Sequence, residues 1–153
     1  MLDDFNDLHL WSPQGVVTRL EESETWNLLH TWSFGRVAVI VDGAPVIFPV
    51  NFAVDRHFLV FRTATGTKLT ALRANPKIAF EADQHSQTDA WSVLVTGTAE
   101  VLEQEKDTDH ADRLPLLPWI PTAVFVYIRI VPETIQGRHI ERTFHLSRLS
   151  STT

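Results

Sequence analysis

Two hydroxyls, a lysine and an arginine fall within a short stretch of this chain, and together they could bind a phosphate group. They belong to Arg62, Thr65, Thr67 and Lys68, with Gly66 between the two threonines. A helix that begins here, capped by Thr65 or Thr67 after a bend at Gly66, would add free backbone N–H groups and the positive end of its dipole. Such groups commonly hold phosphates. A capped turn with solvated basic side chains would give the same pattern, and the spacing is not that of a Walker loop.

The residues around this stretch predict a strand before it and a helix after it. Leu59, Phe61 and Thr63 fall on one face of an extended segment, which is typical of a strand. The pattern then changes to helical spacing and stops at Asn75–Pro76, which fits a helix of about two turns. The polar residues would therefore lie at a strand-to-helix turn.

Other residues that could do chemistry form no recognisable centre. Glu81 and Asp83 lie two apart on one strand face, either as a paired acid site or as a rim position. The acidic cluster at 107–112 fits a solvated helix face. The seven histidines have no metal-binding spacing, and the chain has neither a cysteine nor a Gly-x-Ser-x-Gly motif. We therefore assign no catalytic residue and no metal ligand.

Length and composition indicate a single globular domain. The chain has 153 residues, 44% of them hydrophobic, and a net charge of −6, which opposes nucleic acid or an anionic membrane as a partner. No apolar run reaches membrane-spanning length, and residues 1–5 do not resemble a secretory signal. We expect a cytoplasmic protein with an N-terminal arm at 1–19, one domain at 20–145 and a disordered tail at 146–153.

Short alternating runs predict a mainly β fold with short helices, of the α+β class. A helix is expected from Ser23, its cap, to Gly35, with Trp26 and Trp32 in the core. Asp42–Gly43 predicts a hairpin turn. Six antiparallel strands are predicted at 36–42, 44–54, 57–63, 77–83, 91–102 and 123–131, with a possible short strand at 134–144. Their number and turns favour a closed or nearly closed barrel.

Three further features bear on the barrel. Pro45 and Pro49 lack an N–H group, so each must lie at an edge or a break of the ladder. Gly97 predicts a bulge in a long strand, and a short helix is expected at 104–113. The apolar segment 114–121 should cover either the core or a second subunit.

Several segments in this order resemble the pyridoxamine 5'-phosphate oxidase-like flavoproteins, in a small subgroup common in actinobacteria. The resemblance covers about residues 20–140 and rests on Gly35–Val39, Asp42–Phe52, Phe61–Leu69, Phe80–Asp83, Ala90–Val93 and Gly97–Glu100. It implies a six-stranded split β-barrel, a homodimer and a flavin, FMN, at each of two sites between the subunits. The implied activity is oxidation or reduction of a small-molecule substrate.

The resemblance also assigns roles to residues. The family's phosphate-binding segment falls on Arg62–Lys68. Within it, Arg62 and Thr63 would reach the ribityl chain or the ring, and the residues that would hold the phosphate are Thr65, Gly66, Thr67 and Lys68. A second segment would line the ring, with backbone groups at its pyrimidine edge: Pro49, Val50, Asn51 and Phe52. Three residues could come from the neighbouring subunit: Trp91, Ser92 and Trp119. Trp91 fits a core position equally well.

Departures from the family pattern leave alternatives open. Pyridoxamine phosphate oxidase itself has an extra basic C-terminal segment, to which Gly137–His139 is the nearest match, so that reaction is not expected. Relatives that bind heme or reduce nitroimidazoles depend on a histidine near the flavin, whereas position 62 is arginine and His57 begins its strand. Two alternatives to an FMN-dependent oxidoreductase stay open. One is a reductase that uses a deazaflavin cofactor, and the other is a non-enzymatic carrier of flavin or heme.

Overall fold

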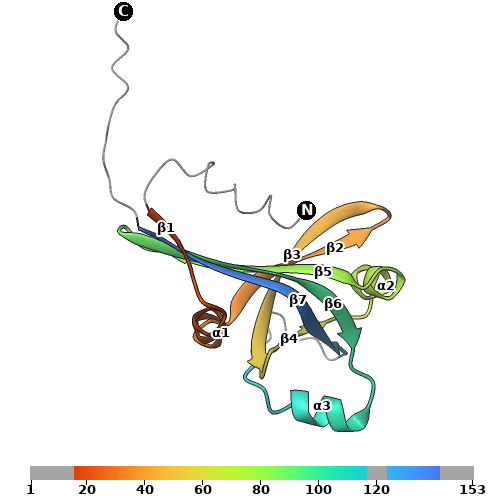
Figure 1. Ribbon diagram of the computed structural model, residues 1–153. Coiled ribbons are helices and arrows are strands. Elements are labelled where there is room, and N and C mark those ends of the chain that lie inside the picture. The colour runs from red at the N-terminus through yellow and green to blue at the C-terminus, as the bar shows by residue number, and fades with distance from the viewer. Residues whose placement is uncertain (1–15, 117–123, 142–153) are drawn as a thin grey trace, which may run out of the picture.

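The computed structural model describes residues 16–116 and 124–141 of the chain. Within these ranges there are seven strands and three short helices, arranged as Figure 1 shows. The strands are β1 (Val16–Arg19), β2 (Phe34–Val41), β3 (Ala44–Asp55), β4 (Phe58–Thr63), β5 (Lys77–His85), β6 (Asp89–Val101) and β7 (Val126–Glu141). The helices are α1 (Glu22–His30), α2 (Thr67–Ala74) and α3 (Glu105–Ala111).

Six of the strands close into an antiparallel barrel, as expected. The ring runs β7-β4-β3-β2-β5-β6, and pairing of β6 with β7 completes it. The described strands number seven because β1, which the sequence did not predict, pairs with β7 outside the ring. The strands expected near 123–131 and 134–144 form one continuous strand, β7.

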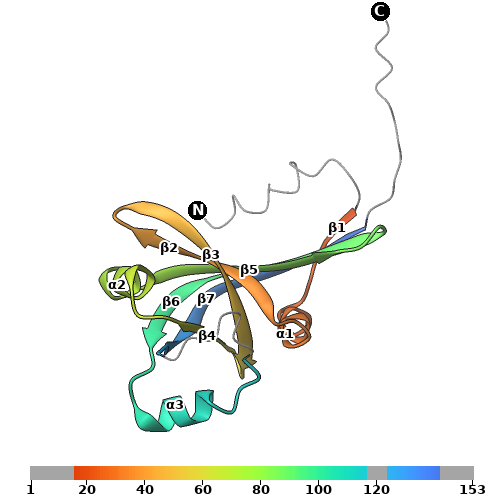
Figure 2. The same ribbon diagram turned by 180° about the vertical axis from the view of Figure 1, so that it is seen from behind.

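The barrel splits along one edge of β7. Residues 126–130 of β7 pair with β4 and residues 138–141 pair with β1, while β6 follows the other edge. Between these pairings the Leu20 N–H donates to the Gly137 carbonyl at 2.8 Å. A Cβ atom on Gly137 would lie 2.3 Å from Thr25 Oγ1, so only glycine lets α1 pack this closely. Figures 1 and 2 place β1 and the β5–β6 tip at one end of the sheet and α2 at the other.

Aromatic and branched side chains fill the barrel. Phe52, Phe61 and Phe80 are among the largest fully buried side chains, and Phe52 meets Phe80 edge-on at 4.8 Å between ring centroids. Trp26 is 5% exposed and Trp32 packs against the same cluster, which confirms their predicted core role. A second apolar cluster lies between α3 and the outer wall of the barrel and includes Val60, Tyr127 and Leu116.

Two turn predictions are confirmed. Asp42 and Gly43 have φ values of 51° and 80°, as a tight hairpin requires. The register of β6 with β7 shifts between Thr96 and Gly97, as the bulge prediction requires. The backbone of Val131 approaches Gly97 so closely that a side chain there would collide with it.

The predicted ends of the first helix are wrong. The N-cap of α1 is Glu21 and Ser23 lies inside the helix, which ends at His30 with Thr31 as its C-cap. Gly35 belongs to β2 instead, because Glu81 and Phe80 approach its backbone too closely for any side chain. None of the helices in the described ranges is long and apolar enough to span a membrane.

Candidate functional site

The turn between β4 and α2 leaves backbone donors unpaired with any capping side chain. Gly66 is the N-cap of α2 and makes no side-chain capping bond, so the prediction that Thr65 or Thr67 caps the helix is wrong. The hydroxyl of Thr70 donates to the Gly66 carbonyl at 3.0 Å instead. The first N–H groups of an α-helix have no partner within the helix. The start of α2 therefore has backbone donors that no side chain caps, and anion binding at this turn stays a prediction.

Lys68 projects from the first turn of α2 toward β3. Its Nζ atom lies 4.2 Å from the centre of the Phe48 ring, within the range of a cation–π contact. Burial lowers the pKa of the Lys68 ammonium, because the half-buried charge has lost part of its water. An anionic ligand beside Lys68 would compensate that loss.

The facing edge of β3 is open. Residues 44–51 pair with β2 alone, because pairing with β4 begins at Phe52 opposite Phe61. The Phe52 N–H donates toward β2, to the Ser33 carbonyl at 2.9 Å. Backbone groups alternate along a strand, so those of Asn51 point to the open edge. Pro45 and Pro49 lie an even number of residues before Asn51, so their backbone groups face the same open edge. Their missing N–H groups therefore remove no hydrogen bond to β2.

The side chains of the β3 segment divide between core and edge. Val50 and Phe52 are 5% and 1% exposed and belong to the barrel core. Their side chains therefore cannot meet a ligand at the open edge. Pro49 is exposed and Asn51 half-buried, so these two can contribute side chains as well.

Arg62 lies on the outer face of β4, beside two aromatic rings that contact each other. Its guanidinium carbon is 4.6 Å from the centre of the Phe125 ring and 5.4 Å from that of Tyr127. Its Nη2 atom donates to the Tyr127 hydroxyl at 3.3 Å, and that hydroxyl donates to Asp112 Oδ1 at 2.5 Å. The Nε atom of Arg62 is buried and has no acceptor among the described residues. Tyr127 and Asp112 were not predicted, because only the register of β4 with β7 brings them to Arg62.

The remaining predicted residues are not all at this turn. Thr63 ends β4, with its buried hydroxyl 3.4 Å from the Ala64 carbonyl. Trp91 and Ser92 lie near the start of β6 and pair with Gln84 and Asp83, at the end of β5 that lies away from α2. Trp91 packs edge-on against Trp32 at 6.0 Å between ring centroids. Trp119 lies outside the described residues. Within one chain, the turn and the Trp91–Ser92 pair are therefore separate.

Glu81 and Asp83 form an ion-pair cluster rather than an isolated acid pair. Arg36 donates from Nε to Glu81 Oε2 and from Nη2 to Asp83 Oδ1, both at 2.9 Å. Burial, and then the hydrogen bond with Asp83, raise the pKa of Glu81 to about 7 despite Arg36. The cluster fits the rim position considered from the sequence, with one carboxyl that titrates near neutrality.

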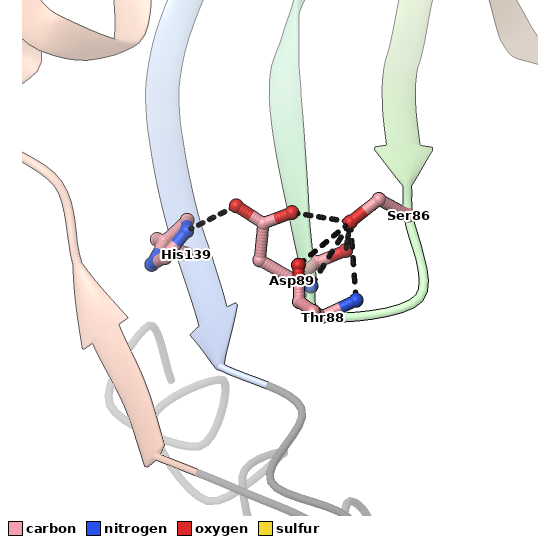
Figure 3. Close-up of polar contacts among 4 residues, drawn as sticks. All are labelled: Ser86, Thr88, Asp89 and His139. Atoms are coloured by element: carbon pink, nitrogen blue, oxygen red, sulfur yellow. Dashed lines mark hydrogen bonds and ion pairs between the residues drawn. The ribbon is translucent and has the colours of Figure 1, made fainter.

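A serine, an aspartate and a histidine meet at the β5–β6 tip, but their order is wrong for nucleophilic catalysis (Figure 3). Ser86 Oγ donates to Asp89 Oδ1 at 2.6 Å, and His139 Nε2 lies 3.3 Å from Asp89 Oδ2. A nucleophilic serine must donate to the histidine, whereas here the carboxylate stands between them. The hydrogen bond from Ser86, and then that from His139, lower the pKa of Asp89. The cluster holds the tip to β7. Across 16–116 and 124–141, no group of histidines and acids could hold a metal ion.

The fold and the turn define a class: a split β-barrel with an uncapped strand-to-helix turn beside an open strand edge. The family model for pyridoxamine 5'-phosphate oxidase matches residues 21–139. The chain belongs to this family.

Two relatives of known structure and a further sequence relative agree with that assignment. A Corynebacterium glutamicum protein, provisionally named a pyridoxamine 5'-phosphate oxidase, is 43% identical, with a TM-score of 0.76 over 82% of this chain and 99% of its own. The FAD binding protein of Mycobacterium smegmatis is 39% identical, with a TM-score of 0.71 over 81% and 98%. An uncharacterized protein of Mycobacterium tuberculosis is 42% identical over 86 residues, which are 56% of this chain and 78% of the relative.

Proposed function

We propose that this protein binds a flavin nucleotide and that the turn between β4 and α2 holds its phosphate. The observation that carries the proposal is the uncapped start of α2 beside the half-buried ammonium of Lys68. The described residues fit a phosphate, because backbone N–H groups and a desolvated cation converge where no acidic side chain neutralises them. The FAD-binding relative, 39% identical, supports a flavin as the molecule that carries the phosphate.

The flavin ring would lie along the open edge of β3. The backbone of Asn51 points there, and N–H and C=O groups match the donors and acceptors of a pyrimidine edge. Ile47 is 66% exposed on this segment, beside exposed Pro45 and Pro49, so a planar apolar ring would cover surface that otherwise meets water.

A second copy of the chain would complete the site. Trp91 and Ser92 pair with Gln84 and Asp83, at the end of β5 that lies away from α2, so we expect them to reach the flavin of a partner's site. A two-fold dimer would place the β5–β6 end of each protomer at the turn of the other. The homodimer is therefore part of the proposal.

The proposed activity is an oxidation or reduction of a small molecule that stacks on the exposed face of the flavin. A bound flavin supplies hydride transfer, and the protein supplies binding, orientation and electrostatics. Lys68 and the start of α2 would anchor the phosphate, and β3 would fix the ring's edge. The second protomer would exclude water. No described side chain is assigned as a proton donor.

The absorption spectrum of the purified protein tests the proposal. Bands near 370 and 450 nm, roughly, are expected for a bound flavin. Mass spectrometry of the cofactor released by heat then distinguishes FMN, our first expectation, from the FAD suggested by the relative. A Soret band would indicate a heme carrier. A colourless protein that binds an added deazaflavin cofactor, and not FMN or FAD, would refute the flavin assignment.

A further inference from the structure

We infer that Asp112 and Tyr127 are positioning residues that hold the Arg62 guanidinium at the edge of the flavin site. The inference rests on the proposed function, since it concerns how the same site is built. Neither residue was assigned to the flavin site from the sequence, where Asp112 falls in the acidic cluster at 107–112.

The three residues form a hydrogen-bonded chain with a fixed polarity. Arg62 Nη2 donates to the Tyr127 hydroxyl at 3.3 Å, and the hydroxyl donates its own proton to Asp112 Oδ1 at 2.5 Å. Burial, and then the bond to Asp112, raise the pKa of Tyr127, so the phenol keeps the proton that it donates. A neutral hydroxyl thus links a cation to an anion.

This chain restrains a side chain that is otherwise costly to order. A free arginine loses rotamer entropy when a ligand fixes it. Here the guanidinium already lies over the rings of Phe125 and Tyr127, at 4.6 and 5.4 Å from their centres. The ordering is therefore complete before any ligand binds, and the affinity for an acceptor at this position is higher.

The restraint leaves donors of Arg62 for a ligand. A guanidinium has five N–H donors, and the Tyr127 hydroxyl accepts one of them, from Nη2. The Nε–H is buried without an acceptor among the described residues, so the terminal Nη1 and Nη2 groups are the donors that a ligand would meet. Arg62 precedes the phosphate-binding turn directly, so the ribityl hydroxyls or the ring carbonyls are acceptors of the right chemistry.

Through the same chain, α3 is connected to the site. Asp112 is the C-cap of α3, and two residues before it the Nε2 atom of His110 lies 3.0 Å from Asp55 Oδ2. The helix is thus attached to the barrel at two points, of which one leads to Arg62. Flavin binding and the docking of α3 should therefore stabilise each other.

A double-mutant cycle tests the inference. FMN affinity is measured by flavin fluorescence for the unsubstituted protein, Tyr127→Phe, Arg62→Ala and the double variant. Tyr127→Phe keeps the ring and removes only the hydroxyl, and we expect about a 5- to 10-fold loss of affinity. Because Tyr127 acts through Arg62, the double variant should bind no more weakly than Arg62→Ala alone.

Asp112→Asn provides a second variant, and Asp109→Asn is its matched control on the same helix. Asp112→Asn should weaken FMN binding about as much as Tyr127→Phe, while Asp109→Asn should not change it. Circular dichroism and urea unfolding confirm that each variant is folded. If the unsubstituted protein binds no flavin, both the proposed function and this inference are refuted. If it binds FMN but Tyr127→Phe and Asp112→Asn bind equally well, or if the effects of Tyr127→Phe and Arg62→Ala add, only the inference is overturned.

Discussion

The Lys68 ammonium lies 4.2 Å from the centre of the Phe48 ring, and this contact connects the first turn of α2 to the open edge of β3. The two segments proposed to hold the phosphate and the ring of one flavin are therefore adjacent in a single chain. The aromatic face orients the charge without neutralising it, so the ammonium stays available to an anion.

Lys68→Ala should weaken FMN binding by about tenfold or more, because it removes a charge-assisted bond to the phosphate. Riboflavin has no phosphate, so its affinity should not change. Titrations of both ligands, with quenching of flavin fluorescence as the signal, give the comparison. Lys77→Ala removes an exposed lysine of β5 and serves as the control for net charge. Equal losses for FMN and riboflavin would contradict the phosphate assignment.

Gly97→Ala should destabilise the barrel without touching the site. Its Cβ atom would lie 2.1 Å from the Val131 carbonyl oxygen, and backbone cannot move aside as a flexible side chain can. Overpacking of this kind costs about 1–3 kcal/mol in the free energy of unfolding, which urea denaturation measures. Gly43→Asn is the matched control, because no atom lies within 4 Å of a Cβ there and asparagine tolerates the turn's positive φ. A stable Gly97→Ala variant would mean that the bulge can relax.

The barrel could be predicted from the sequence because each of its strands has a local signal. Val37 and Val39 alternate with outward residues, and the turn at Asp42–Gly43 fixes their partner strand. β1 has no such signal, since its four residues form a strand only by pairing with residues 138–141 of β7. The cap predictions failed because serine and threonine are common near helix starts, and packing chooses among them.

The same limit explains which parts of the site were missed. The turn could be found because Arg62 and Lys68 are close in sequence. Tyr127 reaches Arg62 only through the β4–β7 register, across 65 residues, and no local pattern indicates such a contact. Whether Trp91 and Ser92 meet the turn of a second protomer depends on a surface that one sequence cannot specify.

The titration of Glu81 should make the folded state less stable as the pH rises toward neutrality. Its folded pKa of about 7 exceeds the ordinary value of 4.5, so the folded protein binds more protons than the unfolded chain between those values. Stability is then lost as the pH rises from about 5 to 7, and it changes no further from this cause above the folded pKa. Calorimetric Tm values across this range should fall for the unsubstituted protein. Glu81→Gln should remove that fall, and an identical pH profile for the variant would refute the shifted pKa.

Asp55 should stabilise the folded protein at neutral pH and lose this effect in acid, which is opposite to the pH dependence expected from Glu81. Burial alone would raise its pKa, but hydrogen bonds from His110 and Arg56 outweigh burial and lower it. This stability is therefore present above the ordinary carboxyl pKa and is lost as the pH falls through the folded pKa. Asp55→Asn breaks a pair whose carboxylate is only 10% exposed, so a loss of about 1–3 kcal/mol is expected in urea unfolding at neutral pH. Asp109→Asn, at an exposed position of the same helix as His110, should change the free energy of unfolding little. If both variants lost the same stability, the loss would come from the change in net charge and not from the contact between Asp55 and His110.

Two defective variants should restore binding when they are mixed, if each flavin site is built from two protomers. Lys68→Ala damages the turn, and Ser92→Glu adds bulk and a repelling charge on the surface proposed to reach the partner's flavin. Each variant alone should bind FMN more weakly than the unsubstituted protein in both of its sites. After the two are unfolded and refolded together, hybrid dimers carry both defects in one site and none in the other. Random assembly should then return about a quarter of the sites, which titration with FMN can count. A mixture with no recovery, although native mass spectrometry shows that hybrid dimers form, would mean that both residues belong to the same site of one protomer or that Ser92 is remote from the flavin.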